Sequence, residues 1–342
     1  MLLQFLLVLP ALADLVLLLQ IWRENSIFKF DGKFCAPASI IVPVRGLDPE
    51  LERNVESLKD QDFPCPFEII YVVDPDQPWL ADRLRQLGVK VVITSTTCSC
   101  SGKIRAQLSG LKESVNEVVV FADSDTLYPR NWLREMVGNL DKHMAVTTFS
   151  WPAPLKITWR NLIRAGFWTL GFESQASGGT FLWGGSMAFR RDFFDSEVLE
   201  ELSREWCDDC TLTRIVKKRG GSIAFDGKAI PLNIYDERDL WKWSTRQVVT
   251  IIKYSSRGAK AFLVIGALML AFPILFLVFL NPFYLSPLLL WILKNFSRSR
   301  NLGKYSYTPS VMSILGVYYG WIKLILDYRK RTVVWRDRVY NL

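Results

Sequence analysis

The clearest chemical signal in the sequence is a pair of aspartates, Asp123 and Asp125, in the segment VVVFADSDTLYP. They follow an apolar run at 117–121 that predicts a buried strand. Open α/β sheets bind their ligands in the crevice at the carboxyl ends of such strands. Two carboxylates in that crevice favour Mg²⁺ or Mn²⁺ with a diphosphate, because these hard cations prefer oxygen ligands.

The composition limits which enzyme classes can carry this site. The chain has 342 residues, of which 50% are hydrophobic and 22% charged. It is too apolar for an ordinary soluble enzyme and too charged for a bundle of membrane helices alone. The formal charge of +8 would suit nucleic acid, but the basic residues gather beside apolar segments, at 253–260, 298–304 and 329–338. This pattern is typical of charge facing anionic lipid, so we expect a membrane and no nucleic acid as partner.

The first apolar segment, residues 1–22, is long enough to cross a bilayer. It has no positive region before it, and its apolar run continues past the small residues at 11–13. These features favour a retained anchor over a cleaved signal peptide. Arg23, Lys29 and Lys33 then predict that its carboxyl end faces the cytoplasm.

Three further apolar segments follow near the carboxyl terminus. Residues 261–280 carry no charge and predict a second span, and 283–296 can return across the bilayer after the break at Asn281 and Pro282. A span at 309–328 would place a basic stretch outside, so an interfacial helix is favoured there. We therefore expect an integral protein of the plasma membrane with its catalytic domain in the cytoplasm. The expected division is an anchor at 1–22, a catalytic domain at 23–257, a transmembrane hairpin with an interfacial helix at 258–328, and a basic cytoplasmic tail at 329–342.

Between the membrane segments, β-branched and apolar runs alternate with helical patterns. A helix is predicted from Asp48 as N-cap with Pro49 at its first position, and others at 101–114 and 129–140. This alternation predicts an α/β domain with a doubly wound, mostly parallel sheet. The predicted strands are residues 39–44, 67–73, 89–94, 117–121 and 144–149.

Five motifs in order carry a family resemblance that covers about residues 39–254. The chain resembles the membrane-bound inverting glycosyltransferases of family 2, nearest to the ceramide glucosyltransferase and cellulose-synthase-like branches. The resemblance implies a GT-A domain that moves a hexose from a nucleotide sugar to an acceptor at the membrane face. The motifs are IIVPVRGLDPELERNVESL, FEIIYVVDPDQP, FADSD, WGGSMAFRRDFF and WCDDCTLTRIVKKRGG, with a weaker echo in TVVWRDRVY.

On the donor side, the resemblance assigns roles to four residues. Asp74 matches an aspartate that contacts the nucleoside, and Lys103 matches a basic position near the donor. Asp123 and Asp125 match the DxD motif, in which the second aspartate ligates the metal and the first reaches the ribose or a metal-bound water. The alternatives are a strand-end turn at Asp74, an ordinary helix-start lysine, and a solvated acidic turn.

On the acceptor side, inversion needs a base that deprotonates the attacking hydroxyl. The chain has a single histidine, His143 in a polar turn, which argues for a carboxylate base. By the family's ED pairing, Asp209 is the base and Asp208 is its neighbour, whose like charge raises the proton affinity of the pair. The alternative is that both aspartates cap a helix starting near Thr211.

Two further segments bear on the acceptor. The loop 183–187 contains two glycines that let backbone approach a sugar, although a tight hairpin turn explains them as well. Arg246 and Gln247 start a family motif that contacts diphosphate or acceptor, but Val249 and Thr250 replace its arginine and tryptophan. The missing tryptophan argues against a polymerising enzyme, and an interfacial helix is the alternative reading of this segment.

The six cysteines include a CxC pair, Cys98 and Cys100, and a CxxC pair, Cys207 and Cys210. A cytoplasmic domain normally keeps its thiols reduced, so reduced cysteines are favoured over disulfides or a zinc site. Because Cys207 and Cys210 flank Asp209, oxidation there should affect activity.

The sequence thus favours a non-processive hexosyltransferase that uses GDP-mannose or UDP-glucose. Its expected acceptor is a lipid or a polyprenyl-linked glycan, and its expected cofactor is Mg²⁺ or Mn²⁺. A processive polysaccharide synthase and a catalytically silent GT-A scaffold in the membrane are the alternatives.

Overall fold

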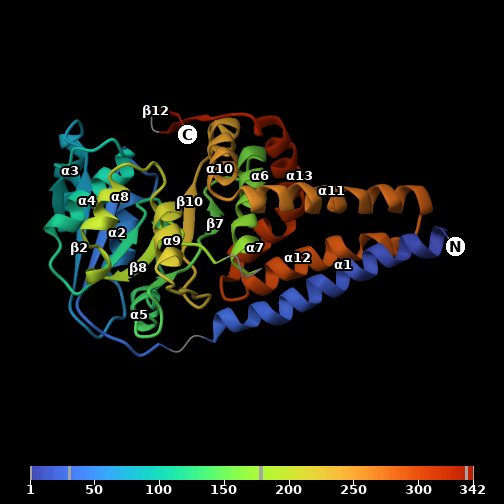
Figure 1. The fold of residues 1–342 in the computed structure, drawn as a ribbon, viewed down its shortest axis with the longest axis horizontal. Coiled ribbons are helices and arrows are strands. Elements are labelled where there is room, and N and C mark those ends of the chain that lie inside the picture. Colours follow the sequence, from blue (N-terminus) through green and yellow to red (C-terminus); the bar gives the residue numbers. More distant parts are fainter. Residues whose placement is uncertain (1, 30–31, 177–179, 336–337, 342) are drawn as a thin grey trace. The chain divides into compact units, whose positions relative to one another are not determined.

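The structure is a computed structural model that describes all residues except 1, 30–31, 177–179, 336–337 and 342 (Figure 1). It divides into two compact units. The sheet unit comprises Ile27–Ser150 and Thr180–Ile234, and the helical unit comprises Met1–Ser26, Trp151–Gly179 and Tyr235–Leu342. The sequence predicts one continuous domain at 23–257, whereas both compact units are made of separate stretches of the chain.

The sheet unit is built on a seven-stranded sheet in the order β3-β2-β1-β4-β8-β6-β9. Strands β1 to β4 are mutually parallel, β8 is antiparallel to β4 and β6, and β6 is parallel to β9. The predicted α/β class with a mostly parallel sheet is confirmed. The strands are β1 (Ala38–Val44), β2 (Phe67–Val73), β3 (Lys90–Ile93), β4 (Val118–Ala122), β6 (Ala145–Thr147), β8 (Ser186–Arg190) and β9 (Ile223–Phe225).

The sheet is buried on both faces, which explains why its strands are apolar throughout. On β1, Ile40 and Val42 face one hydrophobic cluster and Ile41 faces the other. The first cluster includes residues of α2 (Leu51–Lys59), α3 (Pro78–Gln86) and α5 (Trp132–Gly138). The second includes residues of α4 (Gly102–Glu113), α8 (Ser196–Leu202) and α9 (Asp208–Lys218).

The strand order places a topological switch point between β1 and β4. The chain runs outward from β1 through β2 to β3 and then returns to β4 on the other side of β1. Helix α2, which leaves β1, packs on one face of the sheet, and helix α4, which leads into β4, packs on the other, so a crevice forms at the carboxyl ends of β1 and β4. Asp123 and Asp125 follow β4 directly at this edge, before the two-residue strand β5 (Thr126–Leu127), which pairs with β10 (Leu232–Tyr235).

One predicted helix cap is wrong. Helix α2 begins at Leu51, and its N-cap residue Glu50 makes no side-chain cap. The carboxylate of Asp48 instead accepts a 2.5 Å hydrogen bond from Ser124 Oγ, beside the aspartate pair. Ser101 does cap α4, because its Oγ accepts from Ile104 N at 3.3 Å.

The helical unit contains long apolar helices packed through small residues. Helices α1 and α12 lie side by side in Figure 1. Gly266 of α11 meets the Trp321 ring of α13, whose Nε1 donates to Leu263 O at 2.8 Å. The helices are α1 (Leu2–Glu24), α6 (Trp159–Trp168), α7 (Leu170–Ala176), α10 (Leu240–Tyr254), α11 (Ser256–Phe279), α12 (Ser286–Arg298) and α13 (Tyr307–Asp327). Strand β7 (Trp151–Pro154), which precedes α6, belongs to the same unit.

Two helical stretches among the described residues are long and apolar enough to cross a membrane, Ser256–Phe279 and Gly303–Asp327. Helix α12 has 13 residues, fewer than the roughly 20 that a span requires. The second stretch includes the segment expected to lie at the interface. Length and composition do not fix topology, so the arrangement of three spans and an interfacial helix stays a prediction.

A buried ionic network joins α1, α7 and α12 within the helical unit. Arg298 donates to Glu24 at 2.6 and 2.7 Å and to Glu173 at 2.9 Å. Lys294 pairs with Glu173 at 2.6 Å and donates to Gln20 at 2.7 Å. Two cations and two anions thus balance each other where apolar helices meet.

The expected basic tail at 329–342 contains a β-hairpin. Strand β11 (Thr332–Trp335) pairs antiparallel with β12 (Arg338–Asn341), and Val333 is buried.

Candidate active site

The site is assembled around the ammonium group of Lys103 in the sheet unit. Lys103 lies in the first turn of α4, two residues after the Ser101 cap. Its Nζ lies 2.8 Å from Asp123 Oδ1 and 3.4 Å from Asp208 Oδ2, and donates to Gly184 O at 3.0 Å. Burial alone would lower the pKa of Lys103, but the charges of Asp123 and Asp208 outweigh burial and raise it. Lys103 therefore stays cationic.

Asp209 has the electrostatic properties of a general base. It lies in the first turn of α9, and its Oδ2 accepts from Gly184 N at 2.8 Å. Burial and then the charge of Asp208 raise the pKa of Asp209 to about 7, against the opposing charge of Lys103. A base is most effective when its pKa is near the working pH. Asp208 is itself held by Gln107, whose Nε2 donates to Oδ2 at 2.7 Å.

The two glycines of the 183–187 loop are required by close approach. A Cβ on Gly184 would lie 2.8 Å from Lys103 Nζ, 3.0 Å from Asp208 Oδ2 and 3.2 Å from Asp209 Oδ2. A Cβ on Gly185 would lie 2.5 Å from Asp123 Oδ2. The loop backbone therefore passes directly over the charged groups, where any side chain would displace them.

The donor set at Asp123 and Asp125 fits a divalent cation. Around Lys103, the carboxylates of Asp123, Asp208 and Asp209 outnumber the single ammonium, so the site carries excess negative charge. Burial, together with the charge of Asp125 and against that of Lys103, raises the pKa of Asp123. A hard cation held by Asp123 and Asp125 would relieve this repulsion, and carboxylate oxygens are the ligands that Mg²⁺ and Mn²⁺ prefer.

Asp74 directly follows β2 at the same edge of the sheet and is buried in an ion pair. Arg45, directly after β1, contacts Asp74 at 2.5 Å and binds both carboxylate oxygens of Asp76 at 3.1 and 3.0 Å. Arg45 was not among the site residues predicted from the sequence, although its position after a predicted strand marks it as a residue of this edge.

Arg246 and Gln247 lie on α10 in the helical unit and are partly exposed. The Thr250 hydroxyl, at the position of the missing tryptophan, donates to Arg246 O at 2.8 Å, and Val249 is buried. The roles of Arg246 and Gln247 stay predictions.

The expectation of reduced cysteines is wrong for this structure. Disulfides join Cys35 to Cys65, Cys98 to Cys100, and Cys207 to Cys210, with Cα separations of 6.1, 5.2 and 5.4 Å, which are normal for this bond. The prediction relied on the reducing conditions of the cytoplasm, and the sequence alone could not show which sulfur atoms the fold brings together.

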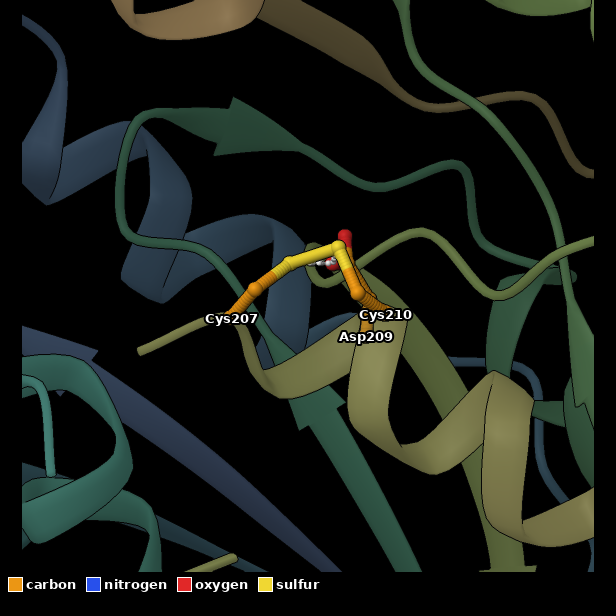
Figure 2. A group of neighbouring side chains, drawn as sticks. All are labelled: Cys207, Asp209 and Cys210. Carbon is orange, nitrogen blue, oxygen red and sulfur yellow. Dashed lines mark hydrogen bonds between the residues drawn. A yellow bond between two sulfur atoms is a disulfide. The ribbon is translucent and has the colours of Figure 1, made fainter. Parts of the chain in front are cut away.

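The Cys207–Cys210 bridge lies against the candidate base. Figure 2 shows it beside the Asp209 carboxylate at the start of α9. The two Sγ atoms lie 2.9 and 3.4 Å from Asp209 Oδ1. Cys207, Asp209 and Cys210 are close enough to share a metal ion, but as a disulfide the sulfurs offer no thiolate.

Three buried supporting residues were not found from the sequence. Gln107 lies one turn after Lys103 on α4, which is a weak signal that they share a face. Asn54 of α2 and Tyr128 after β5 contact the backbone of Asp123, and their sequence positions give no signal of this.

The comparisons with known proteins agree with this geometry. A family model described as glycosyl transferase family 21 matches residues 3–342. This match confirms the glycosyltransferase resemblance inferred from the motifs, with the number 21 in place of family 2. No curated protein sequence matches the chain.

Among solved structures, the chain is similar to a mannosyltransferase from Pyrobaculum calidifontis, PcManGT, in complex with GDP-Man and Mn²⁺. The identity is 17%, the TM-score is 0.51, and the match covers 94% of this chain and 97% of that one. Glucosyl-3-phosphoglycerate synthase from Mycobacterium tuberculosis, with Mn²⁺, UDP and phosphoglyceric acid, matches with 17% identity and a TM-score of 0.41 over 64% of this chain and 78% of that one. The first likeness supports the GT-A fold.

Proposed function

Because the chain belongs to glycosyl transferase family 21, we propose that it is a membrane-bound, inverting, non-processive enzyme that transfers a hexose from a nucleotide sugar. The observation that carries the proposal is the grouping of Asp123, Lys103 and Asp209 at the carboxyl edge of the sheet. A scaffold without activity has no need for three carboxylates gathered around one ammonium group at the carboxyl edge of the sheet.

Asp209 is the proposed base on the acceptor side. Its ionised form takes the proton from the attacking hydroxyl, and no covalent intermediate forms in an inverting transfer. Asp208, fixed by Gln107, keeps negative charge beside Asp209 and so maintains the proton affinity of the base.

On the donor side, Asp123 and Asp125 are the proposed holders of Mg²⁺ or Mn²⁺. When bound, such a cation neutralises the diphosphate and makes it a better leaving group. Lys103 lies beside Asp123 at the start of α4 and supplies a fixed positive charge for the same group. Asp74 is proposed to contact the nucleoside, and Arg246 and Gln247 the diphosphate or acceptor.

The proposed donors are GDP-mannose and UDP-glucose. The similar mannosyltransferase was solved with GDP-Man and Mn²⁺, which favours the first, and the ceramide glucosyltransferase resemblance favours the second. The proposed acceptor is a lipid or polyprenyl-linked glycan, because the chain carries two helical stretches able to cross a membrane. Val249 and Thr250 replace the residues expected of a processive synthase, which argues against that alternative.

The proposed location is the plasma membrane with the sheet unit in the cytoplasm. Three disulfides are unusual there, because cytoplasmic thiols are kept reduced except in hyperthermophiles. Labelling of the sheet unit with a membrane-impermeant reagent in intact cells would place it outside and overturn this orientation.

The test is thermal-shift screening of the purified protein against nucleotide sugars, each with Mg²⁺ or Mn²⁺. A donor that binds the folded state raises the unfolding temperature. Asp125→Asn should weaken this shift, whereas Asp209→Asn should keep it and abolish transfer. No shift with any donor, or full turnover by Asp209→Asn, would contradict the proposal.

A further inference from the structure

The hydroxyl group of Tyr128 joins two loops of the active site. Tyr128 is buried, and its hydroxyl accepts a hydrogen bond from Asp123 N at 2.7 Å and donates one to Gly185 O at 2.8 Å. The ring packs on Trp132, with centroids 4.2 Å apart. One side chain therefore holds the backbone after β4 against the backbone of the 183–187 loop.

The two ends of this link belong to opposite halves of the proposed reaction centre. Asp123 is a proposed metal holder and pairs with Lys103. Gly184, adjacent to Gly185, donates its N–H to Asp209 and accepts from Lys103 through its carbonyl. The position of the base relative to the donor site thus depends on a loop seated on the Tyr128 hydroxyl.

Asn54 holds the other side of the same turn. Its Nδ2 donates to Asp123 O at 3.0 Å and to Thr126 O at 2.5 Å, and its Oδ1 accepts from Tyr71 Oη at 2.6 Å. Asn54 and Tyr71 are fully buried, so water does not compete for these bonds. Without Tyr128, the turn stays attached to α2 and β2 and loses its link to the glycine loop.

Building on the proposed glycosyl transfer, we propose that Tyr128 is a positioning residue that sets the separation between Asp123 and Asp209. Its hydroxyl touches neither carboxylate and acts through the backbone of Asp123 and Gly185. Reacting groups displaced by about 1 Å can lose on the order of 100-fold in rate, so a link of this kind has a measurable effect.

The test compares the wild-type protein with Tyr128→Phe, which keeps the ring and removes every hydrogen bond of the hydroxyl, including its 3.3 Å contact with Asp123 O. We expect kcat to fall by about 10- to 100-fold with a change in donor KM below about threefold. In the absence of metal and donor, hydrogen exchange of the Asp123 amide should accelerate by on the order of tenfold, because its acceptor is lost.

Tyr235→Phe is the matched control. Tyr235 is also buried, and its hydroxyl donates to a backbone carbonyl, Asn161 O, at 2.9 Å. It should leave kcat and exchange at 121–128 unchanged. Should Tyr128→Phe fold poorly, Tyr71→Phe loosens the same turn through Asn54 and should move both readouts in the same direction by a smaller factor.

Two results would overturn the proposal. One is unchanged exchange of the Asp123 amide in Tyr128→Phe, which would show that the hydroxyl does not hold this backbone. The other is a fall in kcat of Tyr128→Phe that is fully explained by the fraction of the variant that is unfolded. If the wild-type protein turns over no nucleotide sugar, the proposed function fails, and the exchange experiment still decides whether Tyr128 ties the two loops.

Discussion

The backbone N–H of Gly184 donates to Asp209 Oδ2 at 2.8 Å, while the Gly184 carbonyl accepts from Lys103 Nζ at 3.0 Å. One peptide segment therefore orients the proposed base and the main cation of the site together. Because the loop passes so close to both groups, the absence of a side chain at this position is part of the active-site geometry.

Gly184→Ala should therefore disable the enzyme without unfolding it. The new Cβ would lie within 3.2 Å of Lys103, Asp208 and Asp209 and would push these charged groups apart. The backbone of Gly184 is not left-handed, so the substitution adds no backbone strain. We expect kcat/KM to fall by on the order of 100-fold with a small change in unfolding temperature.

The control for this substitution is Gly258→Ala. Its Cβ would meet the Ser255 hydroxyl at 2.6 Å and Ser255 Cβ at 3.7 Å; the hydroxyl can rotate away, and activity should stay near that of the wild-type protein. Equal losses in the two variants, or full activity in Gly184→Ala, would show that the loop does not control the site.

The activity should depend on pH through Asp209. A pKa of about 7 means that the base is protonated, and inactive, at acidic pH. We expect kcat/KM to rise about tenfold per pH unit below pH 7 and to level off above it. We call the rising part of this pH profile its acidic limb. An ordinary aspartate, with a pKa of about 3.9, would give no acidic limb in this pH range.

The groups that face Asp209 predict how this limb moves. Asp208 raises the pKa of Asp209 and Lys103 lowers it, so Asp208→Asn should shift the limb to lower pH. The measurement is the pH profile of kcat/KM for both proteins. A limb at the same pH in Asp208→Asn would contradict the assignment of Asp209 as the titrating base.

Much of the sheet unit could be predicted from the sequence, because its strands are short apolar runs buried on both faces. The run at 67–73 agrees with β2, and the run at 117–121 with β4 to within one residue. Residues after parallel strands share an edge, so Asp74, Asp123 and Asp125 could also be placed on one edge of the sheet. Strand β8 was missed, because its first two residues, Ser186 and Met187, fall in the segment 183–187, which was interpreted as a glycine loop.

The supporting contacts of the site could not be predicted in the same way. Asn54 and Tyr128 act through hydrogen bonds to backbone atoms of other segments, and such bonds leave no periodic pattern in a sequence. The helical unit is assembled from three separate stretches of chain. Hydropathy identified its apolar helices, and only the fold shows that α6 and α7 belong with them.

Reduction of the Cys207–Cys210 bridge should make Asp209 a weaker base. A dithiol reductant gives two electrons and two protons to the bridge and becomes a disulfide itself. The resulting thiols can donate to Asp209 Oδ1, from which the sulfurs lie 2.9 and 3.4 Å, whereas bridged sulfurs have no proton to donate. Hydrogen bonds to the ionised form lower a carboxylate pKa.

The expected result is a shift of the acidic limb of kcat/KM to lower pH when dithiothreitol is added. Cys98→Ser/Cys100→Ser should respond to the reductant as the wild-type protein does, and Cys207→Ser/Cys210→Ser should not respond. A limb that stays in place after complete reduction, verified by thiol titration, would show that the bridge does not influence the base.

Asp226 should make the stability of the sheet unit depend on pH. It is fully buried, its Oδ1 accepts from Lys228 N at 2.7 Å, and Asn139 Nδ2 lies 3.4 Å from its Oδ2. Burial, opposed by the Lys228 N–H and aided by the charge of Glu135, raises its pKa to about 7. In the unfolded chain the pKa is about 3.9. The folded state therefore binds the proton more tightly, and this stability is present below pH 4 and is lost as pH rises through 7.

Asp226→Asn removes this titration and keeps an oxygen that can accept from Lys228 N. Relative to wild type, we expect the variant to gain up to about 4 kcal/mol at pH 8, since three pKa units correspond to about 1.4 kcal/mol each, and to gain nothing at pH 4. The measurement is the difference in unfolding temperature between the two proteins from pH 4 to 8, which cancels titrations that both share. A difference that is constant with pH would mean that Asp226 is ionised in the folded protein throughout this range, with its charge balanced by Lys228.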